Sequence, residues 1–151
     1  MNSNSEKVLV SSCLAGFKCR YNGECKTDKQ VIELVRNDNA IPICAEQLAG
    51  LKIPRSPAEI IGGDGEDVLN GNARVISKDG EDFTAQMIKG AEEVLSLCKL
   101  YNIKKAYLKS KSPSCGVNKI YDGTFTGNLI NGNGVLSALL KENGIEIIEV
   151  K

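Results

Sequence analysis

Histidine is absent from the 151 residues of this chain, and its absence narrows the possible chemistry. Without it there are no Ser-His or Cys-His nucleophile pairs, no His-ligated zinc and no imidazole general base. An excess of charge of one sign is also lacking, because nineteen Lys and Arg residues balance nineteen Asp and Glu residues. No global field attracts nucleic acid or an anionic membrane, so we expect a small-molecule partner and no long nucleic acid.

Long apolar runs are lacking as well. The amino terminus reads MNSNSEKV, which lacks the apolar stretch of a signal peptide, and no segment approaches the length needed to span a bilayer. We therefore expect a cytoplasmic protein without a membrane partner. In a reducing compartment its six cysteines are more often ligands, catalysts or core residues than disulfides.

The length and a hydrophobic content of 42% predict a single domain over residues 1–151. Short apolar segments alternate with amphipathic ones, which predicts an α/β fold with a parallel sheet. We expect strands at 7–12, 40–44, 105–108 and 145–150, a short edge strand at 73–77, and helices at 28–37, 84–100 and 135–141. The Gly-, Pro- and Asp-rich segment 50–71 is long enough to be a lid or wall of a site.

Three cysteines, Cys13, Cys44 and Cys115, each lie just past a short apolar run that is predicted to be a strand. The carboxyl ends of parallel strands line one crevice, so three thiolates can converge there. Such a set suggests a soft metal or an iron–sulfur cluster with one position left open for a substrate. Buried core thiols are the competing interpretation, although the prolines and glycines beside these cysteines indicate turns at strand ends.

The other three cysteines need separate interpretations. Cys98 falls on the apolar face of the helix predicted at 84–100, which indicates a core residue. Cys25 lies in the charged stretch GECKTDK and is interpreted as a surface thiol. Cys19 is either a ligand or a structural thiol. The six-residue steps from Cys13 to Cys19 and Cys25 do not match the C-x-x-C pairs of zinc ribbons or thioredoxin-like motifs.

Four polar residues are candidates for the chemistry of a site. Glu46, two residues beyond the second strand-end cysteine, can shuttle protons beside an open metal position, or is a solvated surface charge. Ser112 and Ser114 flank a proline, where their hydroxyls bind a substrate or cap the turn. Arg55, in a Pro-Arg-Ser-Pro frame, reaches a polar substrate atom or lies on the surface. The stretch YDGTFTGN reads as turns and lacks the glycine spacing of a nucleotide site.

Four blocks in this order resemble the thiouracil desulfidase family: SSCLAGFKCRYNG, IPICAEQLAGL followed by PRSPAEI, GAEEVL, and KSKSPSCGVNKIYDGTFTGN. The resemblance spans nearly the whole chain, with a matching cysteine in the first, second and last blocks. It implies a Rossmann-like three-layer domain with a mainly parallel sheet and helices on both faces. It also implies a [4Fe-4S] cluster held by Cys13, Cys44 and Cys115, with one iron free of protein ligands.

The same resemblance implies a hydrolytic reaction without net redox change. The open iron acts as a Lewis acid on the sulfur of a thiolated base such as 2-thiouracil, or of a nucleoside. Water attacks the carbon, Glu46 relays protons, and Ser112 helps to place the substrate. Arg55 and Ser114, singled out above from their own sequence context and not by the resemblance, are further candidates for substrate contacts. The products are the oxo base and hydrogen sulfide.

Two other functions remain open from the sequence. A structural site formed by the three strand-end cysteines and Cys19 would hold zinc or a saturated cluster without a catalytic position. A metal-free thiol redox or binding module would instead need a cysteine pKa lowered by Lys18, Arg20 or Lys111. The sequence fixes neither the physiological substrate, which is a base, a nucleoside or a fragment of transfer RNA, nor the oligomeric state.

Overall fold

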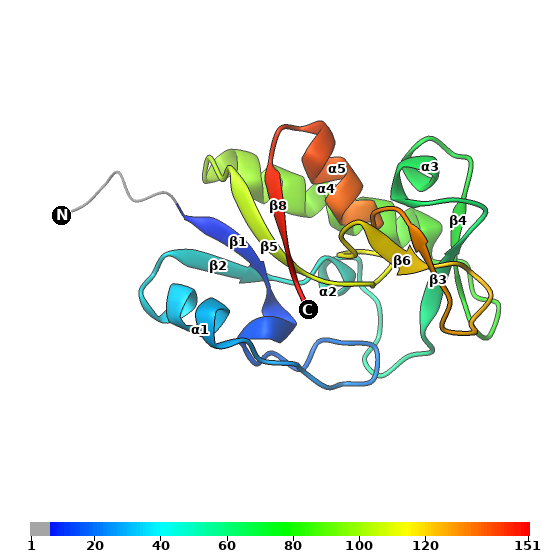
Figure 1. Ribbon diagram of the computed structural model, residues 1–151, viewed down its shortest axis with the longest axis horizontal. Coiled ribbons are helices and arrows are strands. Elements are labelled where there is room, and N and C mark those ends of the chain that lie inside the picture. Colours follow the sequence, from blue (N-terminus) through cyan, green and yellow to red (C-terminus); the bar gives the residue numbers. More distant parts are fainter. Residues whose placement is uncertain (1–6) are drawn as a thin grey trace.

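Four parallel strands form the central sheet in the computed structural model, which describes residues 7–151. They are β1 (Val8–Ser11), β2 (Ala40–Ile43), β5 (Lys105–Lys109) and β8 (Glu146–Val150), in the order β2-β1-β5-β8 across the sheet (Figure 1). Every pairing is parallel, so all four strands end at the same edge. The α/β prediction is therefore confirmed. The amino-terminal residues 1–6 lie outside the described part.

Apolar side chains on both faces explain why these short runs form buried strands. Leu9 and Val10 are adjacent in β1 and therefore point to opposite faces, yet both are fully buried. Leu9 packs in a large core cluster with Leu108 of β5, whereas Val10 packs in a second cluster with Val31. The sheet thus has a core on each face, as a three-layer fold requires.

Helices cover both faces. On the larger core lie α4 (Thr84–Leu100) and α5 (Val135–Glu142), and on the smaller core lies α1 (Lys29–Arg36) (Figure 1). The predicted helix at 84–100 is confirmed to the residue, with Cys98 buried on its core face. None of the helices in residues 7–151 is long and apolar enough to cross a membrane.

The segment 50–71, predicted as a long loop, contains regular secondary structure. It contains β3 (Ala58–Ile61) and α3 (Gly65–Leu69), where a capping box between Asp64 and Asp67 begins the helix. The short edge strand predicted at 73–77 exists as β4 (Arg74–Ser77), which pairs antiparallel with β3 in a separate two-stranded sheet and not at the edge of the central sheet. The sequence did not predict these elements, because the many glycines and aspartates of the segment are also typical of turns and helix caps.

The stretch YDGTFTGN, for which the sequence predicts turns, connects two strands that the sequence analysis did not predict. β6 (Lys119–Tyr121) and β7 (Leu129–Asn131) form an antiparallel hairpin around it. We call the β3–β4 sheet, α3 and this hairpin the distal lobe, residues 58–77 and 119–131. The distal lobe lies beside the central sheet, at the right of Figure 1. Two further short elements, the 3-10 helix η1 (Ser12–Ala15) and α2 (Ala45–Leu48), follow β1 and β2.

Candidate metal centre

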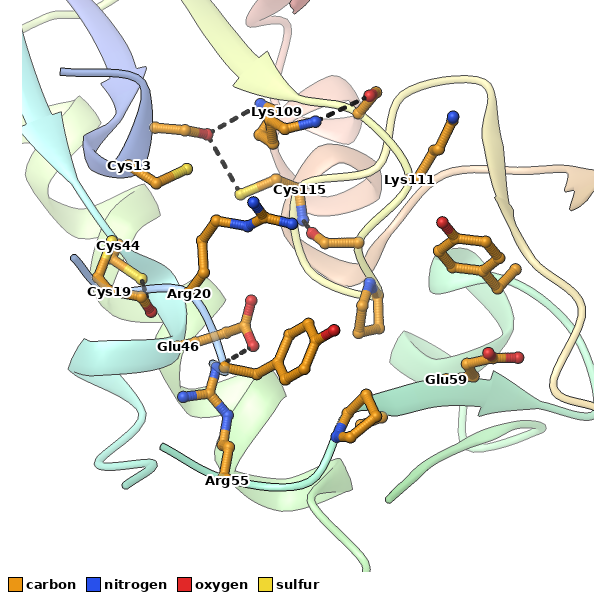
Figure 2. Close-up of a pocket in the computed structure, with 18 of the residues that line it drawn as sticks. Cys13, Cys19, Arg20, Cys44, Glu46, Arg55, Glu59, Lys109, Lys111 and Cys115 are labelled. Atoms are coloured by element: carbon orange, nitrogen blue, oxygen red, sulfur yellow. Dashed lines mark hydrogen bonds and ion pairs between the residues drawn. The ribbon is translucent and has the colours of Figure 1, made fainter. Parts of the chain in front are cut away.

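One cavity of about 490 Å³ lies at the carboxyl ends of the central strands, between the sheet and the distal lobe. Four thiols line it: Cys13, Cys19, Cys44 and Cys115. Cys25 and Cys98 do not. In Figure 2 the four cysteines lie together on one side of the cavity, with Glu59 on the opposite side. Thiols from three separate chain segments therefore face one space.

Each strand-end cysteine is placed by the element that follows its strand. Cys13 lies in η1, directly after β1. Cys44 is the extended N-cap residue of α2, directly after β2. Cys115 lies in the loop after β5. The structure thus brings together the three residues that the strand pattern singled out, because the parallel sheet aligns its carboxyl ends.

Three serine hydroxyls fix Cys115. Ser112 Oγ accepts a hydrogen bond from the Cys115 backbone N–H at 2.7 Å, and Ser137 Oγ donates to its carbonyl at 2.9 Å. Ser11 Oγ donates to the Cys115 sulfur at 3.4 Å. These serines belong to β1, to the loop after β5 and to α5. Backbone and sulfur of Cys115 are therefore held from three directions.

Cys19 is the fourth thiol of the cavity, and its sequence context did not reveal this position. Its side chain is only 3% exposed, and its sulfur lies 3.1 Å from Ser12 Oγ. The Cys44 thiol reaches the Cys19 carbonyl at 4.0 Å. A turn in which the Gly23 N–H donates to the Arg20 carbonyl at 2.8 Å folds the following chain back. The residues RYNG, which are typical of a turn, were the sequence signal that the chain reverses directly after Cys19.

Hydrogen bonds among the thiols separate their acidities. Bonds from Cys13 and Cys44 lower the pKa of the Cys19 thiol. The same bonds to Cys19, together with burial, raise the pKa of Cys13 and of Cys44. Burial raises the pKa of Cys115 to about 11. Binding a metal requires thiolates, so cluster assembly must release protons from these buried groups.

Cationic side chains surround the thiols. Arg20, Lys78, Lys109 and Lys111 line the cavity. Burial, and then repulsion from Lys26 and Arg20, lowers the pKa of Lys109. Positive charge at this density stabilises negative charge nearby, which here is carried by thiolates. These cations therefore offset part of the cost of charging the buried thiols when a metal binds.

Glu46 and Arg55 form an ion pair in the wall of the cavity (Figure 2). Their side chains are 19% and 7% exposed, so neither is a free surface charge. A second guanidinium nitrogen of Arg55 donates to the Lys52 carbonyl at 2.9 Å. One oxygen of Glu46 is therefore held by Arg55. Arg55 itself also lines the cavity, beside that carboxylate.

The two serine candidates separate in the structure. Ser112 lines the cavity, where its oxygen accepts the Cys115 N–H and its own proton remains free to be donated. Ser114 is 2% exposed and does not line the cavity. Its carbonyl accepts the Leu136 N–H at 2.9 Å near the start of α5. Ser112 thus faces the site, whereas Ser114 supports the loop behind it.

Glu59 is a cavity residue that the sequence analysis missed. It is almost fully buried in β3, and its Oε1 accepts the backbone N–H groups of Gly123 at 2.9 Å and Phe125 at 3.2 Å. Tyr121 and Phe125 line the cavity beside it. A single carboxylate thus ties the hairpin to β3 and places an aromatic wall opposite the thiols. The sequence signal for this role was a charged residue, Glu59, within the otherwise apolar strand AEII.

The donor set agrees with an iron–sulfur cluster. Thiolates are the ligands that such clusters use, and here they line a cavity rather than a packed core. No group of three His, Cys, Asp or Glu side chains in residues 7–151 is placed to hold a single metal ion. A four-iron cluster takes each thiolate at a different iron, so its ligands surround a cube and not one point.

Fold and cavity together define the class of protein: an α/β domain with four cysteines lining one cavity at the carboxyl ends of a parallel sheet. The chain belongs to the 2-thiouracil desulfurase family, whose model matches residues 8–151. The resemblance given by the four sequence blocks is thereby confirmed.

Two relatives extend this comparison. "Uncharacterized protein YbbK" of Bacillus subtilis (strain 168) is 48% identical over 141 residues, which cover 93% of this chain and 93% of that protein. A solved structure of the "[4Fe-4S]-dependent thiouracil desulfidase TudS" is similar with a TM-score of 0.84 and 38% identity. The match covers 95% of this chain and 90% of the TudS chain.

Proposed function

We propose that this chain removes sulfur from a thiolated nucleobase such as 2-thiouracil and releases the oxo base and hydrogen sulfide. The observation that carries the proposal is the set of strand-end thiols on one cavity, in a chain of the 2-thiouracil desulfurase family. The structural likeness to the [4Fe-4S]-dependent desulfidase TudS supports the same cofactor here. A cytoplasmic location and a free base or nucleoside as substrate belong to this proposal.

Cys13, Cys44 and Cys115 are the residues that hold the cluster. When bound, a [4Fe-4S] cluster with three protein ligands supplies an open iron that acts as a Lewis acid on the soft sulfur of the substrate. The cations that line the cavity offset the negative charge of the thiolates. The reaction exchanges C=S and water for C=O and hydrogen sulfide, so no electron acceptor is needed.

Glu46 is the general base of the proposal. Its carboxylate lies in the cavity wall, and the ion pair with Arg55 fixes its orientation. The carboxylate takes a proton from the attacking water and returns it to the departing sulfur. We assign Arg55 to the orientation of Glu46, and through that carboxylate to the substrate.

Ser112 donates its hydroxyl proton toward the substrate, because the Cys115 N–H already occupies its oxygen as an acceptor. Ser114 acts from behind the cavity wall, through the carbonyl that it offers to the start of α5. The aromatic wall of Tyr121 and Phe125 offers faces on which a flat ring can stack.

A second candidate is a structural four-cysteine site, which the position of Cys19 on the same cavity, with the Cys44 thiol 4.0 Å from its carbonyl, favours. In that case Cys19 is a ligand, and Cys19→Ser abolishes metal binding. In the desulfidase, Cys19 supports the ligand thiols without binding iron, and Cys19→Ser keeps a cluster with an open position.

The test is anaerobic reconstitution with iron and sulfide, followed by iron and sulfide counting and a hydrogen sulfide assay on 2-thiouracil. We expect four irons and turnover in the wild type, no cluster in Cys13→Ser, and a cluster without turnover in Glu46→Gln. Cys25→Ser is the matched control, since Cys25 does not line the cavity. A wild type that binds no iron, or binds it independently of Cys13, contradicts the proposal.

A further inference from the structure

We propose that Ser11 is a positioning residue that donates a directed hydrogen bond to the Cys115 thiolate and thereby raises the Lewis acidity of the cluster. The inference rests on the proposed function, in which Cys115 binds iron. It concerns a side chain in β1 that neither binds the cluster nor is required to touch the substrate.

The direction of this hydrogen bond follows from two contacts of one hydroxyl. The backbone N–H of Lys109 points at Ser11 Oγ across 3.0 Å, and an N–H can only donate. Ser11 Oγ is therefore the acceptor in that bond, and its own proton must point elsewhere. The Cys115 sulfur lies 3.4 Å from Ser11 Oγ, within the range of a hydrogen bond to sulfur. The hydroxyl thus donates to the sulfur.

The surrounding structure keeps donor and acceptor in place. Ser11 is 3% exposed and ends β1, which is paired with β2 on one side and β5 on the other. The sulfur cannot easily swing away, because Ser112 and Ser137 hold the backbone of Cys115 at its N–H and its carbonyl. A donor fixed in this way needs no reorganisation when charge develops on the sulfur.

The neighbouring serine makes a different contact. Ser12 Oγ lies 3.1 Å from the Cys19 sulfur, and either atom of that pair can be the donor. The Cys44 thiol reaches a backbone carbonyl, that of Cys19, at 4.0 Å. Among the three proposed ligands, Cys115 is therefore the one that receives a hydroxyl donor whose direction the backbone has fixed.

The chemical consequence follows from the electron density on the sulfur. A hydrogen bond withdraws density from a thiolate, so the thiolate donates less to its iron and the reduction potential of the cluster rises. A more electron-poor cluster also polarises a bound C=S group more strongly. Residues that hydrogen-bond metal ligands typically change metal affinity or activity about 10- to 100-fold when they are removed.

The experiment compares Ser11→Ala with the wild type and with Ser12→Ala, whose lost hydroxyl faces Cys19 instead. In the reconstituted proteins we expect Ser11→Ala to lower the cluster midpoint potential and to raise the Fe–S(Cys) stretching frequency in resonance Raman spectra. Its kcat for 2-thiouracil should fall about tenfold. Ser12→Ala should leave the potential close to that of the wild type.

A second pair keeps the test decisive if Ser11→Ala does not fold. Ser11→Thr and Ser11→Val have the same shape, and only the threonine carries a hydroxyl. We expect Ser11→Thr to retain the wild-type potential and Ser11→Val to lower it. Equal potentials in the two variants, with clusters intact, overturn the role of Ser11 and leave the proposed function standing. A wild type without a cluster overturns both.

Discussion

The two sides of the cavity are built in different ways. The thiol side rests on four parallel strands whose side chains are buried on both faces, with Leu9, Val10 and Leu108 fully enclosed. The distal lobe consists of two two-stranded sheets and the short helix α3, and it exposes the apolar side chains of Ile61, Leu129 and Ile130. The thiol side thus has a core on each face of its sheet, whereas the distal lobe joins only the larger core, through residues such as Ile60 and Val75, and leaves its rim exposed.

This difference separates two tasks. Ligands for a metal must keep their geometry within a fraction of an ångström, which a packed sheet provides. A wall that selects substrates tolerates movement and substitution, as do the loops and hairpins of most binding sites. We therefore expect changes on the thiol side to abolish the chemistry or the fold, and changes in the distal lobe to alter substrate binding.

The largest contrast is expected between Cys44→Ser and Phe125→Ala. Cys44→Ser removes a proposed ligand and should eliminate both the four-iron cluster and hydrogen sulfide release. Phe125→Ala removes part of the aromatic wall and should raise KM for 2-thiouracil about fivefold, by loss of a stacking contact of about 1 kcal/mol. Iron counting and steady-state kinetics measure both. Loss of the cluster in Phe125→Ala would break the division between the two sides.

Core packing gives the next contrast. Leu108→Ala leaves a cavity beside Leu9 in the larger core and should lower the free energy of unfolding by about 2–5 kcal/mol. Ile130→Ala in the distal lobe changes a side chain that is already 38% exposed and should cost less than about 1 kcal/mol. Urea unfolding followed by circular dichroism compares them. Similar losses would show that the exposed rim of the distal lobe contributes as much to stability as the buried core.

The Glu59 anchor tests how the distal lobe is positioned. Glu59→Ala removes the acceptor of the Gly123 and Phe125 N–H groups, so the hairpin loop should move and KM should rise several-fold, by about 1–2 kcal/mol of lost binding. Glu59→Gln retains a carbonyl oxygen and should lie closer to the wild type. Both variants should keep the cluster and most of kcat. A fall in kcat at constant KM would instead place Glu59 in the chemistry.

The smallest effect is expected at Asp82, which precedes α4. Hydrogen bonds from Thr84, and then Arg74, lower the pKa of Asp82 to about 2. A lowered carboxyl pKa stabilises the fold above the unfolded value near 4, and this contribution disappears as pH falls toward 2. Because Asp82 is exposed, the contribution should stay below about 1 kcal/mol. The stability difference between wild type and Asp82→Asn, measured by urea unfolding, should shrink between pH 5 and pH 2.

The sequence was most informative where local patterns decide structure. The 3.6-residue apolar period of 84–100 gave both ends of α4 and the burial of Cys98. The three strand-end cysteines could be located because a parallel sheet brings its carboxyl ends to one edge. Both inferences need only the residues of one element or the general topology of the sheet.

Contacts between distant segments could not be read in the same way. Glu59 accepts from residues 64 and 66 positions away, and no local pattern encodes that pairing. The pairing of Arg55 with Glu46 depends on how the intervening loop folds, so the sequence left Arg55 as a substrate contact or a surface residue. Cys19 remained undecided for the same reason.

The distance along the chain between Ser11 and Cys115, 104 residues, has a consequence for how the protein is made. During synthesis the amino-terminal cysteines leave the ribosome long before β5 and Cys115 exist, and a pairing of such high sequence separation forms late in folding. If Cys115 is a ligand, as proposed, the site is complete only after the first part of the last third of the chain has been made. A truncated product that lacks this part also lacks one of the three proposed ligands.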